Sequence, residues 1–408
     1  MTRTAEEEVA LLRRRTVDFV SADELRSRIE AARAERRPLR VKYGADPSAP
    51  DIHLGHVVGL NKLREFQDLG HTVVFIVGDF TARIGDPSGR SRTRPPLSEE
   101  EVQRHAATYR HQVFRVLDPQ RTEVRFNSEW FSPMRLDEVI RLAAHATVSQ
   151  MLAREDFARR HAAGQPISLV EFLYPLIQAY DSVRVNADVE IGGTDQLFNL
   201  LLGREIQKAH GQPPQVIMTL PLLEGLDGTQ KMSKSLGNYV GITEPPGEMF
   251  GKIMSVSDDL MWRYFELVLA LDAEEIVMLR QNVAAGKRHP RAVKEDLARR
   301  IVERFHGAEA AREASEEFAR VFSRRDLPSH MTEIRWPAGE KNGPVRLAEL
   351  LVHAGLAPSR SEARRLIQQG AVRLDDRRVT DPMAEIHVTA PVVVRAGRRG
   401  FARIVPAE

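Results

Sequence analysis

The sequence predicts an α/β protein: a parallel sheet of Rossmann type with a helical insertion, followed by an α-helical domain and a small α+β domain. The pattern strand, helix, strand occurs twice, around residues 39–77 and 189–218. The strand expected at residues 73–77 is entirely apolar, which is typical of a parallel strand covered by helices on both faces. A chain of 408 residues also exceeds the usual size of one hydrophobic core, so two or three domains are expected.

The first unit begins with a strand at residues 39–44 and continues through a loop of turn-forming residues at 46–51. Apolar residues recur at helical spacing over residues 54–66, and Gly70 is suited to end that helix. The apolar strand at 73–77 closes the unit.

The second unit has a strand at residues 189–191, a glycine pair at 192–193, a helix running through residues 200–209 and a strand at 216–218. Two such halves predict a nucleotide-binding sheet. The residues between the halves, about 98–187, form a mostly helical insertion that we expect to contact a second copy of the chain.

Four segments follow from these patterns. Residues 1–243 form the Rossmann-type domain, and residues 244–330 form a helical domain. Residues 331–344 contain the prolines and glycines of a linker. Residues 345–408 form a small domain with 11 Lys and Arg against 7 Asp and Glu, so the excess positive charge of the chain lies there. Such an excess indicates either a nucleic-acid partner or a solvated basic domain.

The composition excludes several classes of protein. Apolar residues make up 42% of the chain and charged residues 28%, as in a globular protein. The chain has no cysteine, which excludes disulfides, thiolate metal sites and cysteine nucleophiles. We find no apolar run long enough to cross a membrane and no signal peptide, so we expect a cytoplasmic protein without membrane contact.

A histidine motif, His-Leu-Gly-His, stands at residues 53–56, where the loop after the first strand enters a helix. His53 and His56 are three residues apart, so their imidazoles face the same way. The start of a helix offers unpaired N–H groups and Gly55 permits close approach, which suits the motif to nucleotide phosphates. The alternatives are surface histidines or a zinc site, for which no third ligand lies nearby in the sequence.

A lysine motif, Lys-Met-Ser-Lys-Ser, stands at residues 231–235 between glycines. Lys231 and Lys234 are suited to clamp a polyphosphate whose charge grows as the bond between its α- and β-phosphates breaks. An exposed basic loop is the alternative. The five-residue string and its distance from the histidine motif favour two halves of one site.

Together these motifs resemble the paired signature motifs of the class I aminoacyl-tRNA synthetases. Three further segments make the chain similar to the tyrosyl-tRNA synthetases, namely IGDPSGR at 84–90, YPLIQAYD at 174–181 and GGTDQ at 192–196. The resemblance covers nearly the whole chain. It implies activation of L-tyrosine with ATP to tyrosyl-adenylate and pyrophosphate, transfer of tyrosine to the 3′ end of tRNA(Tyr), Mg²⁺ bound through the ATP phosphates without a protein metal site, and a homodimer.

The resemblance also assigns site residues. The expected ATP-binding residues are Gly44, Asp46, Ser48, His53, Gly55, His56, Gly192, Asp195, Lys231, Ser233 and Lys234. Gly44 and Asp46 are assigned to the adenosine, Gly192 and Asp195 to the ribose, and Ser48 with the histidines to the phosphates. His53, His56, Lys231 and Lys234 are expected to act in catalysis.

The expected tyrosine-binding residues are Asp86, Tyr174, Gln178, Asp181 and Gln196. The first three are assigned to the ammonium group, which needs anionic and carbonyl-type acceptors. Asp181 is assigned to the phenolic O–H, a contact that rejects phenylalanine because the analogue leaves a buried acceptor unpaired. A helix cap or a salt bridge is the alternative for Asp181. Gln196 is assigned to the tyrosine carboxylate or the transferred carbonyl.

One position departs from the family pattern. Many relatives have a tyrosine two residues before Gly44 that shares the phenol with the aspartate, whereas this chain has Lys42 there and Tyr43 beside it. Adjacent strand residues point to opposite faces, so Tyr43 is not expected to substitute. Recognition of the phenol is therefore expected to depend more on Asp181.

The terminal segment resembles a small RNA-binding module found in bacterial tyrosyl synthetases. Arg360, Arg364 and Arg365 recur on one side of an expected helix at residues 359–367, which suits contact with tRNA phosphates. Pairing of these arginines with neighbouring carboxylates such as Glu362 is the alternative. Two other functions stay open on the sequence alone: a tryptophanyl-tRNA synthetase, or a non-catalytic RNA-binding protein on a Rossmann scaffold.

Overall fold

The computed structural model describes residues 3–88, 98–323, 332–336, 344–375, 377–397 and 400–406. The chain divides into two compact units, Met1–Ser315 and Glu316–Glu408. The last two residues of the IGDPSGR motif, Gly89 and Arg90, lie outside the described residues, as does much of the expected linker.

The first unit is built on a six-stranded sheet with the order β1-β6-β5-β2-β3-β4. Its strands are β1 Phe19–Val20, β2 Arg40–Ala45, β3 Thr72–Val77, β4 Thr122–Phe126, β5 Val189–Gly193 and β6 Val216–Leu220. All neighbours pair in parallel except β1, which runs antiparallel to β6. The predicted parallel sheet of Rossmann type is confirmed, because every strand expected from the repeated pattern lies in it.

Two strands of the sheet have no counterpart in the sequence prediction. β1 is only two residues long, and β4 lies inside the segment that the pattern marked as a helical insertion. All five residues of β4 are half-buried, so its sequence Thr-Glu-Val-Arg-Phe lacks the apolar run that marks β3. Edge strands carry a weaker pattern because only part of their surface is covered.

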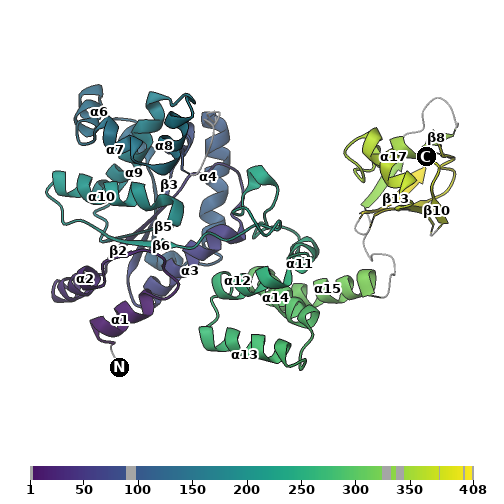
Figure 1. The fold of residues 1–408 in the computed structure, drawn as a ribbon, viewed down its shortest axis with the longest axis horizontal. Coiled ribbons are helices and arrows are strands. Elements are labelled where there is room, and N and C mark those ends of the chain that lie inside the picture. Colours follow the sequence, from purple (N-terminus) through teal and green to yellow (C-terminus); the bar gives the residue numbers. More distant parts are fainter. Residues whose placement is uncertain are drawn as a thin grey trace. The chain divides into compact units, whose positions relative to one another are not determined.

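Helices lie on both sides of the sheet (Figure 1), with α3 Leu54–Asp68 on one side and α9 Leu169–Arg184 and α10 Leu197–Ala209 on the other. The alternation along β2 shows the two faces. The Lys42 ammonium donates to the backbone carbonyl of Gln178 in α9, whereas a Cβ at Gly59 of α3 would clash with the Tyr43 ring. Successive side chains of one strand therefore reach different helices.

Further helices of the first unit precede β5 in the sequence. They are α1 Ala5–Leu12, α2 Ala22–Ala34, α4 Glu99–Val113, α5 Ser128–Phe131, α6 Leu136–Ala143, α7 Val148–Leu152 and α8 Glu155–Ala162. A capping box at Ser98 and Glu101 begins α4, and another at Ser168 and Glu171 begins α9.

After the sheet the chain is helical, with α11 Pro246–Met254, α12 Asp258–Leu267, α13 Ala273–Ala284, α14 Pro290–His306 and α15 Ala308–Phe318. Helix α14 buries an apolar stripe that includes Val293, Leu297, Ile301 and Phe305, which packs against α11 and α12. None of the helices within the described ranges is both long and apolar enough to cross a membrane.

The second unit is a small α+β domain. Its elements are β7 Thr332–Trp336, β8 Val345–Arg346, α16 Leu347–His353, α17 Arg360–Gln368, β9 Val372–Leu374, β10 Arg377–Val379, β11 Glu385–Ile386, β12 Val392–Ala396 and β13 Gly400–Pro406. Leu350, Leu351, Ile367, Val394 and Ile404 form part of its own core. β7, which falls in the expected linker, pairs in parallel with β13.

Candidate functional site

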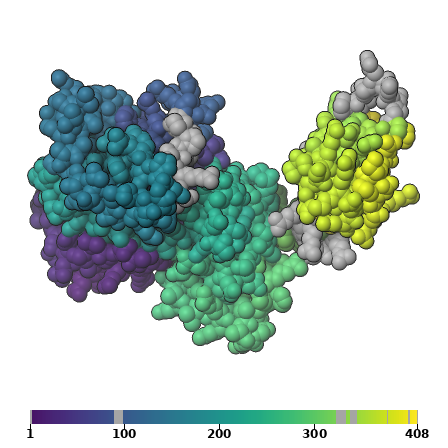
Figure 2. Space-filling view, turned by 45° about the horizontal axis from the view of Figure 1, so that its top comes forward, coloured from purple at the N-terminus to yellow at the C-terminus, as the bar shows by residue number. Residues whose placement is uncertain are grey.

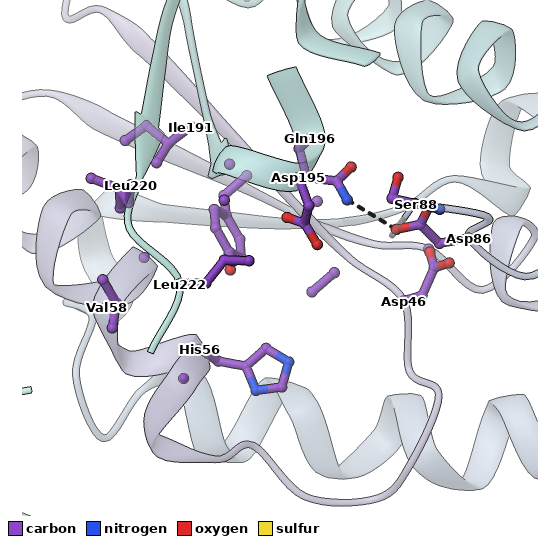
Figure 3. A pocket seen from close by; sticks show the side chains of 18 of the residues that line it. Asp46, His56, Val58, Asp86, Ser88, Ile191, Asp195, Gln196, Leu220 and Leu222 are labelled. Carbon is purple, nitrogen blue, oxygen red and sulfur yellow. Dashed lines mark hydrogen bonds between the residues drawn. The ribbon is translucent and has the colours of Figure 1, made fainter. Parts of the chain in front are cut away.

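A cavity of about 280 Å³ opens at the carboxyl ends of β2, β3, β5 and β6. This edge of an open parallel sheet is where ligands bind in such folds. Every residue assigned to ATP or tyrosine from the sequence lines the cavity, except Lys234. Figure 3 shows part of the lining, with Asp46, Asp86 and Ser88 along one side and His56 at the start of α3.

The two histidines cap the start of α3 with their ring nitrogens. The Nδ1 of His53 accepts the backbone N–H of Gly55 at 3.2 Å, and the Nδ1 of His56 accepts the backbone N–H of His53 at 3.2 Å. Burial lowers the pKa of His53 well below its ordinary value and that of His56 to about 4. Both rings are therefore neutral at pH 7 and carry their hydrogen on Nε2, which leaves each ring with a hydrogen-bond donor.

Two glycines at strand ends have different roles. A Cβ built on Gly44 would meet nothing within 4 Å, so this side of β2 leaves open space for a substrate. A Cβ on Gly192 would approach the Cβ of Gln196 to 2.9 Å. Any larger residue at position 192 would therefore displace Gln196 from the cavity wall.

Both lysines of the second motif are paired with carboxylates. The Lys231 ammonium lies 2.7 Å from Oδ2 of Asp195, and the Lys234 ammonium lies 2.8 Å from Oδ2 of Asp51. Lys231 is 41% exposed, and the loop ends at Gly237 with a positive φ of 67°. The acidic partner of Lys231 is the residue assigned to the ribose.

The end of the cavity assigned to the amino acid contains a network of hydrogen bonds. The Gln196 amide donates to Oδ2 of Asp86 at 3.0 Å, as the dashed line in Figure 3 marks. The Asn199 amide donates to Gln178 at 2.9 Å and to Gln196 at 3.1 Å. The backbone N–H of Ser88 donates to Asp86 at 2.8 Å. Asn199 of α10 thereby holds Gln178 and Gln196, and Gln196, just before α10, holds Asp86.

Asp46 joins the two ends of the cavity. The Tyr174 hydroxyl donates to its Oδ2 at 2.9 Å, and the Thr81 hydroxyl donates to its Oδ1 at 2.6 Å. Burial and the adjacent Asp46 carboxylate raise the pKa of Tyr174 well above its ordinary value, so the phenol stays protonated and donates. A residue assigned to adenosine thus contacts one assigned to the ammonium group.

Asp181 is buried, with 3% of its surface exposed. The Trp130 indole donates to its Oδ1 at 2.9 Å, and the Asn127 amide lies 3.5 Å from its Oδ2. Burial raises the pKa of Asp181 to about 7, while Lys42 and the two hydrogen bonds act against this rise. Among the described contacts, the Asp181 carboxylate neither caps a helix nor forms an ion pair.

Lys42 does not reach the cavity wall. Its ammonium is fully buried beneath it and pairs with Glu190 at 2.8 Å. Tyr43 points to the α3 side, as the alternation of the strand predicts, and lines the cavity from there. Glu190 itself lines the cavity.

Several site residues were not predicted from the sequence. They are Asp51, Thr81, Asn127, Trp130, Glu190 and Asn199. Thr81 and Asn127 follow β3 and β4, so their position after strands was an available signal. The sequence carried no such signal for Trp130, because a single tryptophan on a short helix is most simply interpreted as a core residue.

Arg360, Arg364 and Arg365, the arginines assigned to tRNA, lie on α17 and are exposed. Arg365 pairs with Glu362 at 2.5 Å, and Arg360 pairs with Glu349 at 3.2 Å. Surface pairs of this kind contribute little to stability, so their arginines remain able to contact phosphates. Asp376, a further carboxylate near them in the sequence, lies outside the described residues.

Comparison with protein families matches two models. Residues 34–323 match "tRNA synthetases class I (W and Y)", and residues 345–388 match the S4 domain. A tyrosine–tRNA ligase of Moorella thermoacetica is 55% identical over 98% of this chain and 97% of its own. A tyrosine–tRNA ligase of Oleidesulfovibrio alaskensis is 51% identical over 98% of this chain and 99% of its own.

Solved structures share the fold. A C-terminally truncated mitochondrial tyrosyl-tRNA synthetase of Aspergillus nidulans has a TM-score of 0.63 and 23% identity, covering 78% of this chain and 94% of its own. A tyrosyl-tRNA synthetase of Archaeoglobus fulgidus complexed with L-tyrosine has a TM-score of 0.61 and 24% identity, covering 76% and 99%. At these identities the likeness concerns the fold.

Proposed function

This chain belongs to the class I tyrosyl-tRNA synthetases, and from this premise we propose which residues carry each part of the reaction. The enzyme activates L-tyrosine with ATP to tyrosyl-adenylate and pyrophosphate, and then transfers tyrosine to tRNA(Tyr) with release of AMP. The relatives favour tyrosine over tryptophan as the substrate. The observation that carries the residue assignment is one cavity lined from both halves of the sheet by both sets of residues.

At the nucleotide end, His53 and His56 donate from Nε2 to the phosphates of ATP. Their neutral state follows from burial, so they stabilise phosphate oxygens by hydrogen bonding without adding charge. Ser48, Gly55 and Ser233 line the same cavity. Gly44 leaves open space for the adenosine, whereas Gly192, next to the ribose, makes room for the Gln196 side chain.

The lysine loop changes partners when ATP binds. Asp195 accepts the ribose hydroxyls, which releases Lys231, and the phosphates draw Lys234 away from Asp51. Both ammonium groups then face the pyrophosphate, where negative charge grows as the tyrosine carboxylate attacks the α-phosphorus and the bond to the β-phosphate oxygen breaks. This exchange explains why both lysines are paired with carboxylates in the structure.

The ATP phosphates would hold the Mg²⁺ ion. Within the described part of the chain, no three histidine or carboxylate side chains form a cluster that could hold a metal ion. Bound to the phosphates, the ion would neutralise part of their charge.

At the amino-acid end, Asp86, Tyr174 and Gln178 hold the tyrosine ammonium group, and Asp181 accepts the phenolic O–H. Gln196 orients the carboxylate that attacks. Asp46, through its hydrogen bonds to Tyr174 and Thr81, lies where the two substrates meet. The fixed network leaves little to reorganise when tyrosine enters.

The S4 domain binds tRNA(Tyr) through Arg360, Arg364 and Arg365. These arginines are exposed on one helix and carry the positive charge that RNA phosphates attract. A terminal hydroxyl of the tRNA then attacks the adenylate carbonyl, and AMP leaves with the bonding electrons. Since its substrates ATP and tRNA are cytoplasmic, we place the enzyme there.

The insertion provides the contact between two copies of the chain. Its surface exposes Leu136 (74%), Ile140 (61%), Val148 (63%) and Leu169 (81%). Next to them lies an apolar cavity of about 600 Å³ lined by side chains that include Phe131, Met134 and Leu173. The segment, coloured blue to teal, forms part of the surface in Figure 2. Exposed apolar patches of this kind mark interfaces.

Sedimentation equilibrium of the wild type and of Leu169→Glu tests the dimer, with Met383→Glu as the control. Met383 is an exposed apolar residue of the terminal unit, at 52%. A dimeric wild type that only Leu169→Glu dissociates supports the interface. A monomeric wild type contradicts it.

ATP–pyrophosphate exchange with each of the twenty amino acids tests the activity. Exchange that depends on tyrosine alone is the expected result. Exchange with tryptophan would contradict the assignment of Asp181, and no exchange with any amino acid would contradict the catalytic assignment as a whole.

A further inference from the structure

A charged pair lies buried beneath the tyrosine end of the cavity. Lys42 on β2 is 0% exposed and Glu190 on β5 is 2% exposed, and their charged atoms are 2.8 Å apart. The two residues are direct partners in the register of the parallel strands. The functions proposed above do not use this pair.

All three hydrogens of the Lys42 ammonium have acceptors. Besides Glu190, they are the Ser182 hydroxyl at 2.8 Å and the backbone carbonyl of Gln178 at 2.9 Å. The second carboxylate oxygen of Glu190 accepts from the Ser182 hydroxyl at 3.2 Å and from the Gln215 amide. One ammonium group thus ties two strands of the sheet to a single turn of α9.

That turn carries two of the residues assigned to tyrosine, Gln178 and Asp181. Gln178 and Ser182 bracket it, Asp181 precedes Ser182, and the Gln178 side chain lines the cavity. The other groups against Asp181 are the Trp130 indole and the Asn127 amide, which hold its two oxygens. A movement of this turn would change the distance from Asp181 to the phenol.

Stability alone does not account for the pair. Desolvating two charges costs free energy that their attraction often fails to recover, so well-packed apolar residues would serve a core position as well or better. A fully satisfied buried network does specify one geometry, however. The Lys42 charge also acts against the effect of burial on Asp181 and favours its ionised form.

We propose that Lys42 is a positioning residue for tyrosine recognition, which fixes the Gln178–Ser182 turn so that Asp181 presents its carboxylate to the phenol. The proposal rests on the proposed function of Asp181. It assigns the specificity for tyrosine in this enzyme to a buried cation that does not touch the substrate.

Exchange kinetics with tyrosine and phenylalanine, measured on the full chain, test the proposal. Lys42→Met keeps the length of the side chain and removes its three donors. We expect the ratio of kcat/KM for tyrosine to kcat/KM for phenylalanine to fall roughly tenfold to a hundredfold, with a raised KM for tyrosine and an unchanged KM for ATP. A ratio that stays at the wild-type value would overturn the proposal.

A second variant tests the proposal even if Lys42→Met does not fold. Lys42→Met leaves Glu190 buried without a counter-charge, which is itself strongly destabilising. Lys42→Met with Glu190→Gln removes both charges. The ratio should fall in this double variant too, because the Gln178 carbonyl and the Ser182 hydroxyl have lost the same donor; a folded double variant with a ratio within about twofold of wild type would refute the positioning role.

Lys62→Met is the matched control. Lys62 is 2% exposed, pairs with Glu65 at 2.5 Å and donates to the carbonyls of Leu12 and Arg14, away from the cavity. Its loss should lower the thermal midpoint and leave the ratio unchanged. An equal fall of the ratio in this control would mean that general loosening of the fold is the cause, which overturns the proposal. Absent tyrosine exchange in the wild type would instead refute the proposed function itself.

Discussion

The two ends of the cavity are built differently. At the end assigned to tyrosine, the side-chain amides of Gln196 and Asn199 hold Asp86 and Gln178, and Asp181 is buried against the Trp130 indole. At the phosphate end, Lys231 and Lys234 stand on a glycine-containing loop and are paired with acids of the site. One end is held by hydrogen bonds among its own side chains, whereas we propose that the other exchanges its partners when ATP binds.

From this difference we expect the two ends to affect binding and catalysis separately. A preformed network discriminates between substrates, because an analogue that cannot complete it leaves buried groups unpaired. A loop that changes partners can reserve its strongest contacts for the transition state. Substitutions at the tyrosine end should therefore alter specificity, and those at the phosphate end should alter kcat.

The largest effect is expected at Asp181. Asp181→Ala removes the acceptor for the phenolic O–H and leaves Trp130 and Asn127 without it, so kcat/KM for tyrosine in pyrophosphate exchange should fall roughly 10³-fold or more. The KM for ATP should stay the same. Unchanged kcat/KM for tyrosine would show that Asp181 does not bind the phenol. The proposed difference between the two ends of the cavity would then be wrong.

Lys234→Ala tests the phosphate end of the cavity, where we expect a change in kcat. Its ammonium is expected to meet the pyrophosphate only as charge leaves, so kcat should fall roughly a hundredfold with little change in the KM for ATP. Steady-state exchange kinetics measure both constants. A large rise in the KM for ATP at constant kcat would mean that Lys234 binds ATP in the ground state instead.

The strands and motifs that form both ends of the cavity could be predicted from the sequence. The strands expected at 39–44, 73–77, 189–191 and 216–218 are present with bounds shifted by only a few residues, because the apolar patterns of buried parallel strands are strong. The histidine and lysine motifs lie around one cavity, since both follow strands whose carboxyl ends meet at one edge of the sheet.

Contacts between distant side chains could not be predicted in this way. The partners of Lys42 include Ser182, 140 positions away, and Asp51 meets Lys234 across 183 positions. Periodicity describes which face of an element is buried and is silent about which polar groups meet across elements. A lysine in a strand next to buried residues signals only that a partner is needed.

Deletion of residues 345–408 should leave both ends of the cavity intact. All residues that line the cavity belong to the first compact unit, so pyrophosphate exchange should change by less than about twofold, while aminoacylation of tRNA(Tyr) falls at least roughly tenfold through lost phosphate contacts. Pyrophosphate exchange and aminoacylation, assayed in parallel on one preparation, measure the two effects. Equal losses in both would argue against a role of the S4 domain in tRNA binding.

The two ends should also differ in their response to pH. With a pKa of about 7, Asp181 loses its charge as the pH falls, so kcat/KM for tyrosine should drop about tenfold between pH 8 and pH 6. His56, with a pKa of about 4, stays neutral over this range, so kcat/KM for ATP at saturating tyrosine should hold steady. A matching decline for both substrates would place the titrating group outside the tyrosine end.

The smallest effect is expected at Asp51, where the loop is held before ATP binds. The pair with Lys234 is partly exposed, at 38% for Asp51, so it should contribute only about 0–1 kcal/mol. Asp51→Asn would destabilise the free enzyme alone and raise kcat/KM for ATP by up to about fivefold at constant kcat. Asp272→Asn, which breaks an exposed pair with Arg14 far from the loop, should change neither constant. A lower kcat in Asp51→Asn would show that Asp51 still holds Lys234 in the transition state, and the exchange of partners at the phosphate end would then be limited to Lys231.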